Sequence, residues 1–144
     1  MKWRLLLPLG LCGPLLGGLT VLGLVPRGAD RFAWSGVVIL CAVLVARRSR
    51  ERALLNGAVL GFWNGASSTL VQALWVETLV TNNPWIADTF AGQPPGFDLE
   101  FFVFMLVPFI GVAGGAMTGL LAMLAARAFD ARRAGSRRGG ETPP

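Results

Sequence analysis

The stretch that decides the fold is Ala53 to Val80, ALLNGAVLGFWNGASSTLVQALWVETLV, which is long and apolar enough to cross a membrane as a helix. Three plainer apolar stretches accompany it, at about 5–25, 29–46 and 101–128. We therefore expect an all-α integral membrane protein with four transmembrane helices in a single domain, 1–128. The central stretch differs from an inert anchor because it carries polar side chains: Asn56, Asn64, Ser67, Ser68, Thr69, Gln72 and Glu77.

The composition agrees with a membrane protein. Of the 144 residues, 53% are hydrophobic and 15% are charged, whereas soluble proteins have about 25% charged residues. Histidine is absent, which removes the commonest metal and haem ligand and the usual acid–base group near neutral pH. We therefore expect no catalytic residue, no metal site and no cofactor.

The two cysteines, Cys12 and Cys41, are isolated in apolar surroundings without the spacing of a metal or redox motif. Buried thiols commonly pack as small hydrophobic groups. If the first two spans form a hairpin, both cysteines lie at a similar depth, and the sequence leaves open whether they touch. We do not expect a disulfide.

The first span follows Lys2 and Arg4, as the core of a signal peptide would. Its apolar run is longer than such a core, however, and no convincing cleavage site follows it. We expect an uncleaved transmembrane helix, which Pro8 and Pro14 should weaken or kink.

The one long loop runs from Thr81 to Glu100 and contains a possible short interfacial helix over Pro84 to Ala91. Asn83 would be its N-cap and Pro84 its first residue. After the fourth span, the segment 129–144 is rich in Arg, Gly, Ser and Pro and has no apolar periodicity, so we expect it to be disordered.

Basic residues predict the orientation. Eleven of the 13 Lys and Arg residues lie at the amino terminus, in the turn Arg47–Arg52 or from Arg127 onward, whereas Arg27 and Arg31 lie on the other side. Positive charge accumulates on the cytoplasmic side, so both termini should be cytoplasmic in a bacterial inner membrane. The basic tail either only fixes this topology or also binds anionic lipid headgroups. It has no interleaved aromatic residues, so we expect no nucleic-acid binding.

Two rows of glycine recur every four residues in the third and fourth spans, and small residues let helix backbones approach closely. The rows are Gly57, Gly61 and Gly65, and Gly111, Gly115 and Gly119. Because consecutive spans run antiparallel, Gly61 should lie at the depth of Gly115, with the outer glycines matched likewise. We expect the two spans to pack along these rows, with a homodimer as the alternative use of one row.

Asn64, Ser68 and Gln72 lie within about 80° of one another on a helix, on the same side as the glycines. They form either interhelical hydrogen bonds, worth on the order of 0.6 kcal/mol each, or a hydrated site for a small polar solute between spans three and four. Glu77 completes the candidate polar site, but it lies near the helix end on the opposite side. It is either an interfacial carboxylate beside Arg27 or Arg31, or a proton-coupled group if it points inward.

The layout from Arg47 to Trp85 has a basic turn and a glycine- and polar-rich third span that ends in an Asn-Pro loop. It resembles uncharacterised small four-span bacterial membrane proteins, which have no assigned chemistry. We expect a non-enzymatic accessory or assembly subunit, or a self-associating scaffold packed through the glycine rows. A small transporter or channel is the alternative. The expected partners are the lipid bilayer and further copies or a larger membrane complex.

Overall fold

The computed structural model describes residues 3–94 and 96–138, with side chains described for 7–94 and 96–133. Within these residues all the regular secondary structure is helical and no strand is present, which confirms the all-α class. The elements are α1 (Trp3–Gly10), α2 (Cys12–Val21), α3 (Ala29–Arg48), the 3-10 turn η1 (Arg50–Arg52), α4 (Ala53–Leu74), α5 (Val76–Asn82), α6 (Pro84–Phe90) and α7 (Leu99–Arg138).

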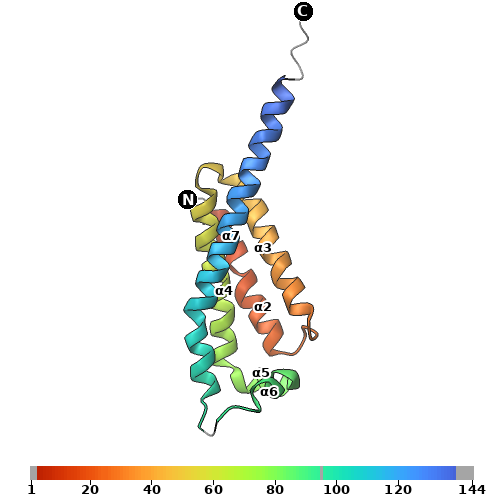
Figure 1. The fold of residues 1–144 in the computed structure, drawn as a ribbon, viewed down its shortest axis with the longest axis vertical. Coiled ribbons are helices and arrows are strands. Elements are labelled where there is room, and N and C mark those ends of the chain that lie inside the picture. Colours follow the sequence, from red (N-terminus) through yellow and green to blue (C-terminus); the bar gives the residue numbers. More distant parts are fainter. Residues whose placement is uncertain (1–2, 95, 139–144) are drawn as a thin grey trace, which may run out of the picture.

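The helices form an elongated bundle built on α4 and α7, which lie side by side and make the largest contact in the molecule (Figure 1). On one side α2 packs on α4, while α3 packs on both α7 and α4. The short helices α5 and α6 lie across one end of the bundle, here called the α6 end (Figure 1). The other end, which carries the turn between α3 and α4, is called the basic end.

Two helices, α3 and α7, are long and apolar enough to cross a membrane, and Leu7–Val21 forms a shorter apolar helical segment. The sequence predicted four such spans. Helix α4 is not among these candidate spans, and glycine and polar residues occupy one of its faces. Its inward polar side chains Asn56, Asn64, Ser68 and Thr69 are buried, while its outward side chains, such as Leu55 and Trp63, are exposed and apolar.

The first span is not one helix from 5 to 25. It breaks at Leu11 into α1 and α2 and ends at Val21. Proline has no backbone N–H, so Pro14 cannot donate to the carbonyl of Gly10 four residues earlier, and the helix is interrupted there as the prolines predict.

The third span is also not continuous, because it breaks at Trp75, where the backbone leaves the helical region (φ −124°, ψ 38°). No glycine or proline explains this break locally. The tail prediction is wrong for residues 129–138, since α7 continues to Arg138. Alanine and arginine favour helix, and Phe129 and Asp130 contact the basic turn. Residues 139–144 lie outside the described part of the chain.

The core lies in the half of the bundle near the basic end. It is built mainly from small side chains, which let α3 approach α4 and α7 closely: Leu9, Cys41, Ala42, Val45, Ala46, Ala53, Leu60, Ala122 and Ala126. Val45, Ala46 and Ala122 have no exposed surface. Closer to the α6 end the gap between α3 and α7 is less completely filled, and this is where the candidate site lies.

Candidate functional site

The glycine rows of α4 and α7 face each other within one chain. A Cβ atom added to Gly57 would lie 2.9 Å from the Cα atom of Gly119, and one added to Gly65 would lie 3.3 Å from the Cα atom of Gly111. These pairs follow the antiparallel matching expected from the sequence. Both rows pack inside the molecule, so neither is the homodimer surface that was the alternative.

The middle of this contact is shifted by one residue from the expected pairing. Gly61 packs against Gly114 and Thr118, and Gly115 packs instead against Ala58 and Phe62. The sequence row did not include Gly114, because it lies beside Gly115 rather than four residues from it. We call this α4–α7 contact the glycine seam.

The Asn64 amide makes interhelical hydrogen bonds, one of the two roles expected for the polar stripe, but it bonds to the first span rather than to α7. The backbone N–H of Gly13 donates to Asn64 Oδ1 at 2.9 Å, and Asn64 Nδ2 donates to the carbonyl of Leu9 at 3.2 Å. In an unbroken helix the N–H of Gly13 would donate to Leu9 itself. The Asn64 amide is therefore inserted into the backbone hydrogen bond at the break between α1 and α2.

Trp63 satisfies the next carbonyl of the same break. Its Nε1 donates to the carbonyl of Gly10 at 3.1 Å, which is the group left without a donor by Pro14. Gly13 lets the helices approach, because a Cβ atom there would clash with the backbone of Asn64. In the sequence, Pro14 indicates an interrupted helix and Gly13 allows a neighbouring helix to come close. The sequence did not show which helix this neighbour would be.

Ser68 continues the contact with the first span. A Cβ atom on Gly17 would lie 2.7 Å from the carbonyl oxygen of Ser68 and 2.8 Å from its hydroxyl. The Ser68 side chain is 1% exposed, and among the described residues its hydroxyl has no hydrogen-bond partner. Asn64 and Ser68 therefore share a side of α4, but that side faces α2.

Two other asparagines hold the end of α2, and the sequence analysis did not assign this role to them. Asn82 Nδ2 donates to the carbonyl of Val21 at 3.0 Å, and Asn83 Nδ2 donates to that of Thr20 at 2.8 Å. Asn83 does precede α6, but its side chain makes no capping bond to that helix. The bend at Trp75 accompanies these contacts, since they turn α5 toward α2.

Glu77 lies apart from the other candidate residues. It is exposed on α5, beyond the break at Trp75. Among the described side chains, Glu77 forms no salt bridge with Arg27 or Arg31. The salt bridge that these side chains do form joins Arg50 to Asp130. The four candidate residues thus do not form one site.

A cleft lies between α3 and α7 toward the α6 end and consists of two neighbouring chambers that share Trp34 and Ile110. The first, the apolar chamber, has a volume of about 360 Å³. Its walls include Val37, Ala113 and Met117, and the glycine seam and Asn64 form its floor. Met117 is 52% exposed and Ile110 42%, so this chamber opens on the surface between α3 and α7.

The second chamber, the polar chamber, also has a volume of about 360 Å³ and lies nearer the α6 end. Gln72, Ser68 and the carboxylate residue Asp30 line it, together with Trp34 and Trp85. Gln72 is half-buried and makes no side-chain hydrogen bond within the described segments. Much of the remaining lining is aliphatic, including Leu79, Val103 and Leu106, so the chamber combines a few polar groups with apolar and aromatic walls, and the apolar chamber adjoins it.

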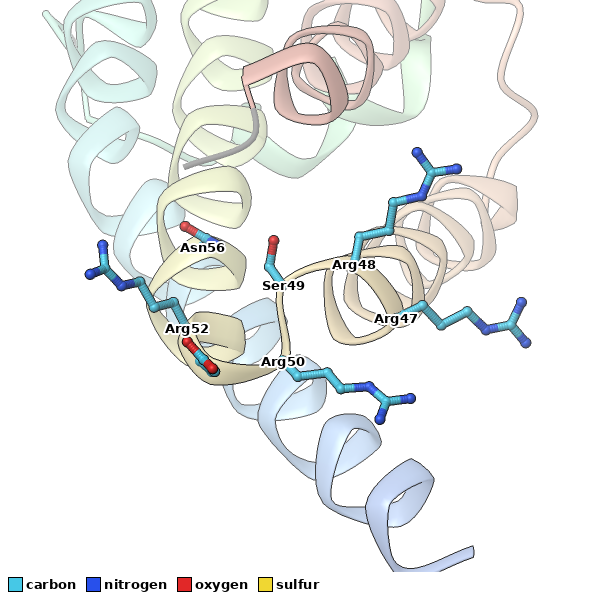
Figure 2. Close-up of a pocket in the computed structure, with 7 residues that line it drawn as sticks. Arg47, Arg48, Ser49, Arg50, Arg52 and Asn56 are labelled. Atoms are coloured by element: carbon cyan, nitrogen blue, oxygen red, sulfur yellow. The ribbon is translucent and has the colours of Figure 1, made fainter. Parts of the chain in front are cut away.

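A separate pocket of about 600 Å³ lies at the basic end, around Arg47, Arg48, Arg50, Arg52 and Asn56. Figure 2 shows the arginine side chains fanning outward from the turn in different directions rather than converging on one point. Arg50 donates to Asp130 at 2.9 Å, and the Arg47 guanidinium lies 5.5 Å from the centre of the Phe129 ring. Two of the arginines thus contact α7.

The cysteines are both free thiols, Cys41 being buried and Cys12 half-buried. In the described segments, no group of three Cys, Asp or Glu side chains is arranged as ligands of a metal ion. Comparison with protein-family models, with curated proteins and with solved structures found no match. The function is therefore inferred from the geometry of this chain.

Proposed function

We propose that the chain is a non-enzymatic protein that crosses a bacterial inner membrane four times, with both termini in the cytoplasm. The four membrane segments would be α1 with α2, then α3, α4 and α7. Large apolar side chains exposed on these helices, such as Phe32, Phe62 and Phe109, support this proposal, because soluble proteins rarely expose large contiguous apolar patches. The grouping of arginines at one end agrees with cytoplasmic basic loops.

Within the membrane we propose the role of an accessory or assembly subunit, acting through association with other chains or with its own copies. The observation that carries this proposal is the bonding of Asn64. Its amide lies at the centre of the bundle, where a catalytic or conducting group would be placed, yet it joins backbone groups of α1 and α2. The Asn64 amide therefore supports the fold of this chain, and we place the contacts with partners on the outer faces of the bundle.

Purification of the full chain in a mild detergent, followed by mass measurement of the protein–detergent particle, tests this role. We expect a mass above that of one chain of 15.3 kDa, either from several copies or from a co-purifying protein. A strict monomer without any partner would contradict the accessory role but would leave the membrane topology standing.

The second candidate function is a small transporter or channel, which the two chambers near Ser68 and Gln72 favour. The packed core at Val45, Ala46 and Ala122 closes the bundle toward the basic end, so α3 would have to move for a solute to pass. Solute flux into proteoliposomes tests this candidate. Flux that is unchanged by Asn64→Leu combined with Gln72→Leu would remove it.

A further inference from the structure

We propose that the cleft between α3 and α7 binds a membrane phospholipid whose headgroup carries an ammonium group. One acyl chain would lie in the apolar chamber, and the ammonium group would lie in the polar chamber. This inference rests on the membrane embedding proposed above but not on the accessory role. It assigns a ligand to a cleft that the helices do not fill.

The apolar chamber matches an acyl chain in chemistry and in access. Ligand pockets have volumes of roughly 300–1,000 Å³ and mostly apolar walls, and the two chambers, at about 360 Å³ each, fall in this range. The half-exposed side chains of Ile110 and Met117 lie where the chamber meets the surface. That surface would face lipid, so a chain can enter sideways from the bilayer without crossing water.

The charge of the polar chamber selects the headgroup. Among the described residues that line this chamber, Asp30 is the only charged one. Its side chain is half-buried. The salt bridge found in the described part of the chain does not involve it. A partly buried carboxylate is stabilised by a nearby positive charge, and an ammonium group brought by a lipid supplies one.

The aromatic walls favour the same headgroup. Trp34 and Trp85 both line the polar chamber, and tryptophan is the side chain that attracts cations most strongly over its ring face. Tryptophan also prefers the membrane–water interface, which is the depth of a lipid headgroup. Both residues therefore lie where an ammonium group of a bound phospholipid would be.

The hydrogen-bonding groups of the chamber give a further, independent indication of a ligand. The Ser68 hydroxyl is 1% exposed and has no partner among the described residues, and the Gln72 amide is also unengaged there. The threonines are different, because Thr20 and Thr69 donate to carbonyls of their own helices. A ligand with donors and acceptors in the chamber would engage the Gln72 amide, whereas an alkane chain would not.

Native mass spectrometry of the purified full chain tests the headgroup assignment. The protein is mixed with equal amounts of phosphatidylethanolamine and phosphatidylglycerol that have identical acyl chains, and the retained lipids are counted. We expect wild type to retain the ethanolamine lipid over the glycerol lipid by about tenfold, because the Asp30 carboxylate holds the ammonium group against the tryptophan rings and repels an anionic headgroup. Asp30→Asn should bring the ratio close to one.

Asp88→Asn is the matched control, because Asp88 is an exposed carboxylate on α6 at the same end of the bundle. It changes the net charge equally and should leave the ratio unchanged. If Asp30→Asn does not give a cooperatively melting protein, Trp85→Leu provides the same comparison. A wild-type ratio near one, or an equal loss of preference in Asp88→Asn, would overturn the proposal.

Blocking the apolar chamber separates chain binding from headgroup binding. Ala113→Phe should fill the chamber and lower retention of both lipids, whereas Val112→Phe, on the exposed neighbouring position, should not. Tetraphenylphosphonium, a lipophilic cation, serves as the competitor. Binding of this cation together with lipid retention that Ala113→Phe does not affect would show a solute site instead and overturn the lipid assignment.

Discussion

At the scale of single residues, Asn64 shows why a polar side chain can be essential inside an apolar bundle without being a site of chemistry. A helix interrupted by Pro14 leaves backbone groups that need partners, since an unpaired polar group in an apolar medium costs several kcal/mol. The Asn64 amide has one donor and one acceptor side, and these meet Leu9 and Gly13 respectively. A serine at this position could not replace it, because a single hydroxyl oxygen could not reach both the N–H of Gly13 and the carbonyl of Leu9.

We therefore expect Asn64→Leu to lower the free energy of unfolding in detergent by about 1–3 kcal/mol, the cost of leaving buried hydrogen-bonding groups without partners. Thermal unfolding followed by circular dichroism measures this loss. Gln72→Leu is the control, because it makes the same kind of change two turns further along without breaking a bond within the described residues. Equal stability of Asn64→Leu and wild type would contradict the role assigned to the amide.

At the scale of elements, the glycine seam fixes the distance between α4 and α7. A side chain at Gly61 would meet the carbonyl of Gly114 and the hydroxyl of Thr118. These are backbone and short side-chain atoms, which cannot move aside as the end of a long side chain can. The close contact therefore depends on the absence of a Cβ atom at this position.

Gly61→Ala should destabilise the protein by about 1–3 kcal/mol, which is typical of overpacking a filled contact. Gly36→Ala on α3 is the matched control, because nothing lies within 4 Å of an added Cβ atom there. Alanine has the higher helix propensity, so this control should be neutral or slightly stabilising. The two midpoints of thermal unfolding, measured in the same detergent, give the comparison, and similar midpoints would argue against the seam.

A second contact between elements joins the basic turn to the extension of α7. Arg50 and Asp130 are 28% and 61% exposed, so water weakens their attraction. A double-mutant cycle with Arg50→Ala and Asp130→Ala should give a coupling energy of about 0.2–1 kcal/mol that decreases as salt is added. A larger coupling energy that does not change with salt would contradict this prediction. It would mean that water does not reach the pair.

The sequence predicted those features of the elements that have a local cause. Pro14 interrupts the first apolar segment, and the antiparallel glycine rows match at Gly57 and Gly119. The break at Trp75 was not predictable, because no glycine or proline marks it locally and it accompanies contacts of Asn82 and Asn83 with the distant end of α2. The direction of Asn64 was missed for a similar reason, since helical periodicity gives the angle between residues but not which neighbour occupies each side.

At the scale of the whole molecule, the bundle is closed at one end and open at the other. Small residues let α3 pack against α4 and α7 near the basic end, whereas the cleft near the α6 end exposes Trp34 and Gln72 to its chambers. The sequence could not show this difference, because a chamber results from how three helices diverge. Both ends nevertheless carry polar groups. These are the arginines at the basic end, and Asp30 and Gln72 toward the α6 end.

This asymmetry predicts which positions react from each side of the membrane. In a chain with Cys12 and Cys41 replaced by alanine, Gln72→Cys should react with a membrane-impermeant thiol reagent added outside intact cells. Ser49→Cys, in the basic turn, should react only after the membrane is opened, because the topology proposed above places this turn in the cytoplasm. The measured quantity is the labelled fraction of the protein with time, before and after permeabilisation.

A chain with Cys12→Ala and Cys41 retained is the internal control, since Cys41 is 1% exposed in the packed core and should remain unlabelled under both conditions while the core is closed. The positions discriminate between the proposals because each fails in its own way. Labelling of Ser49→Cys from outside would reverse the orientation. Labelling of Gln72→Cys at equal rates from both sides, together with reaction of Cys41, would show that α3 moves away from α4 and α7. The transporter would then explain the cleft better than the accessory subunit does.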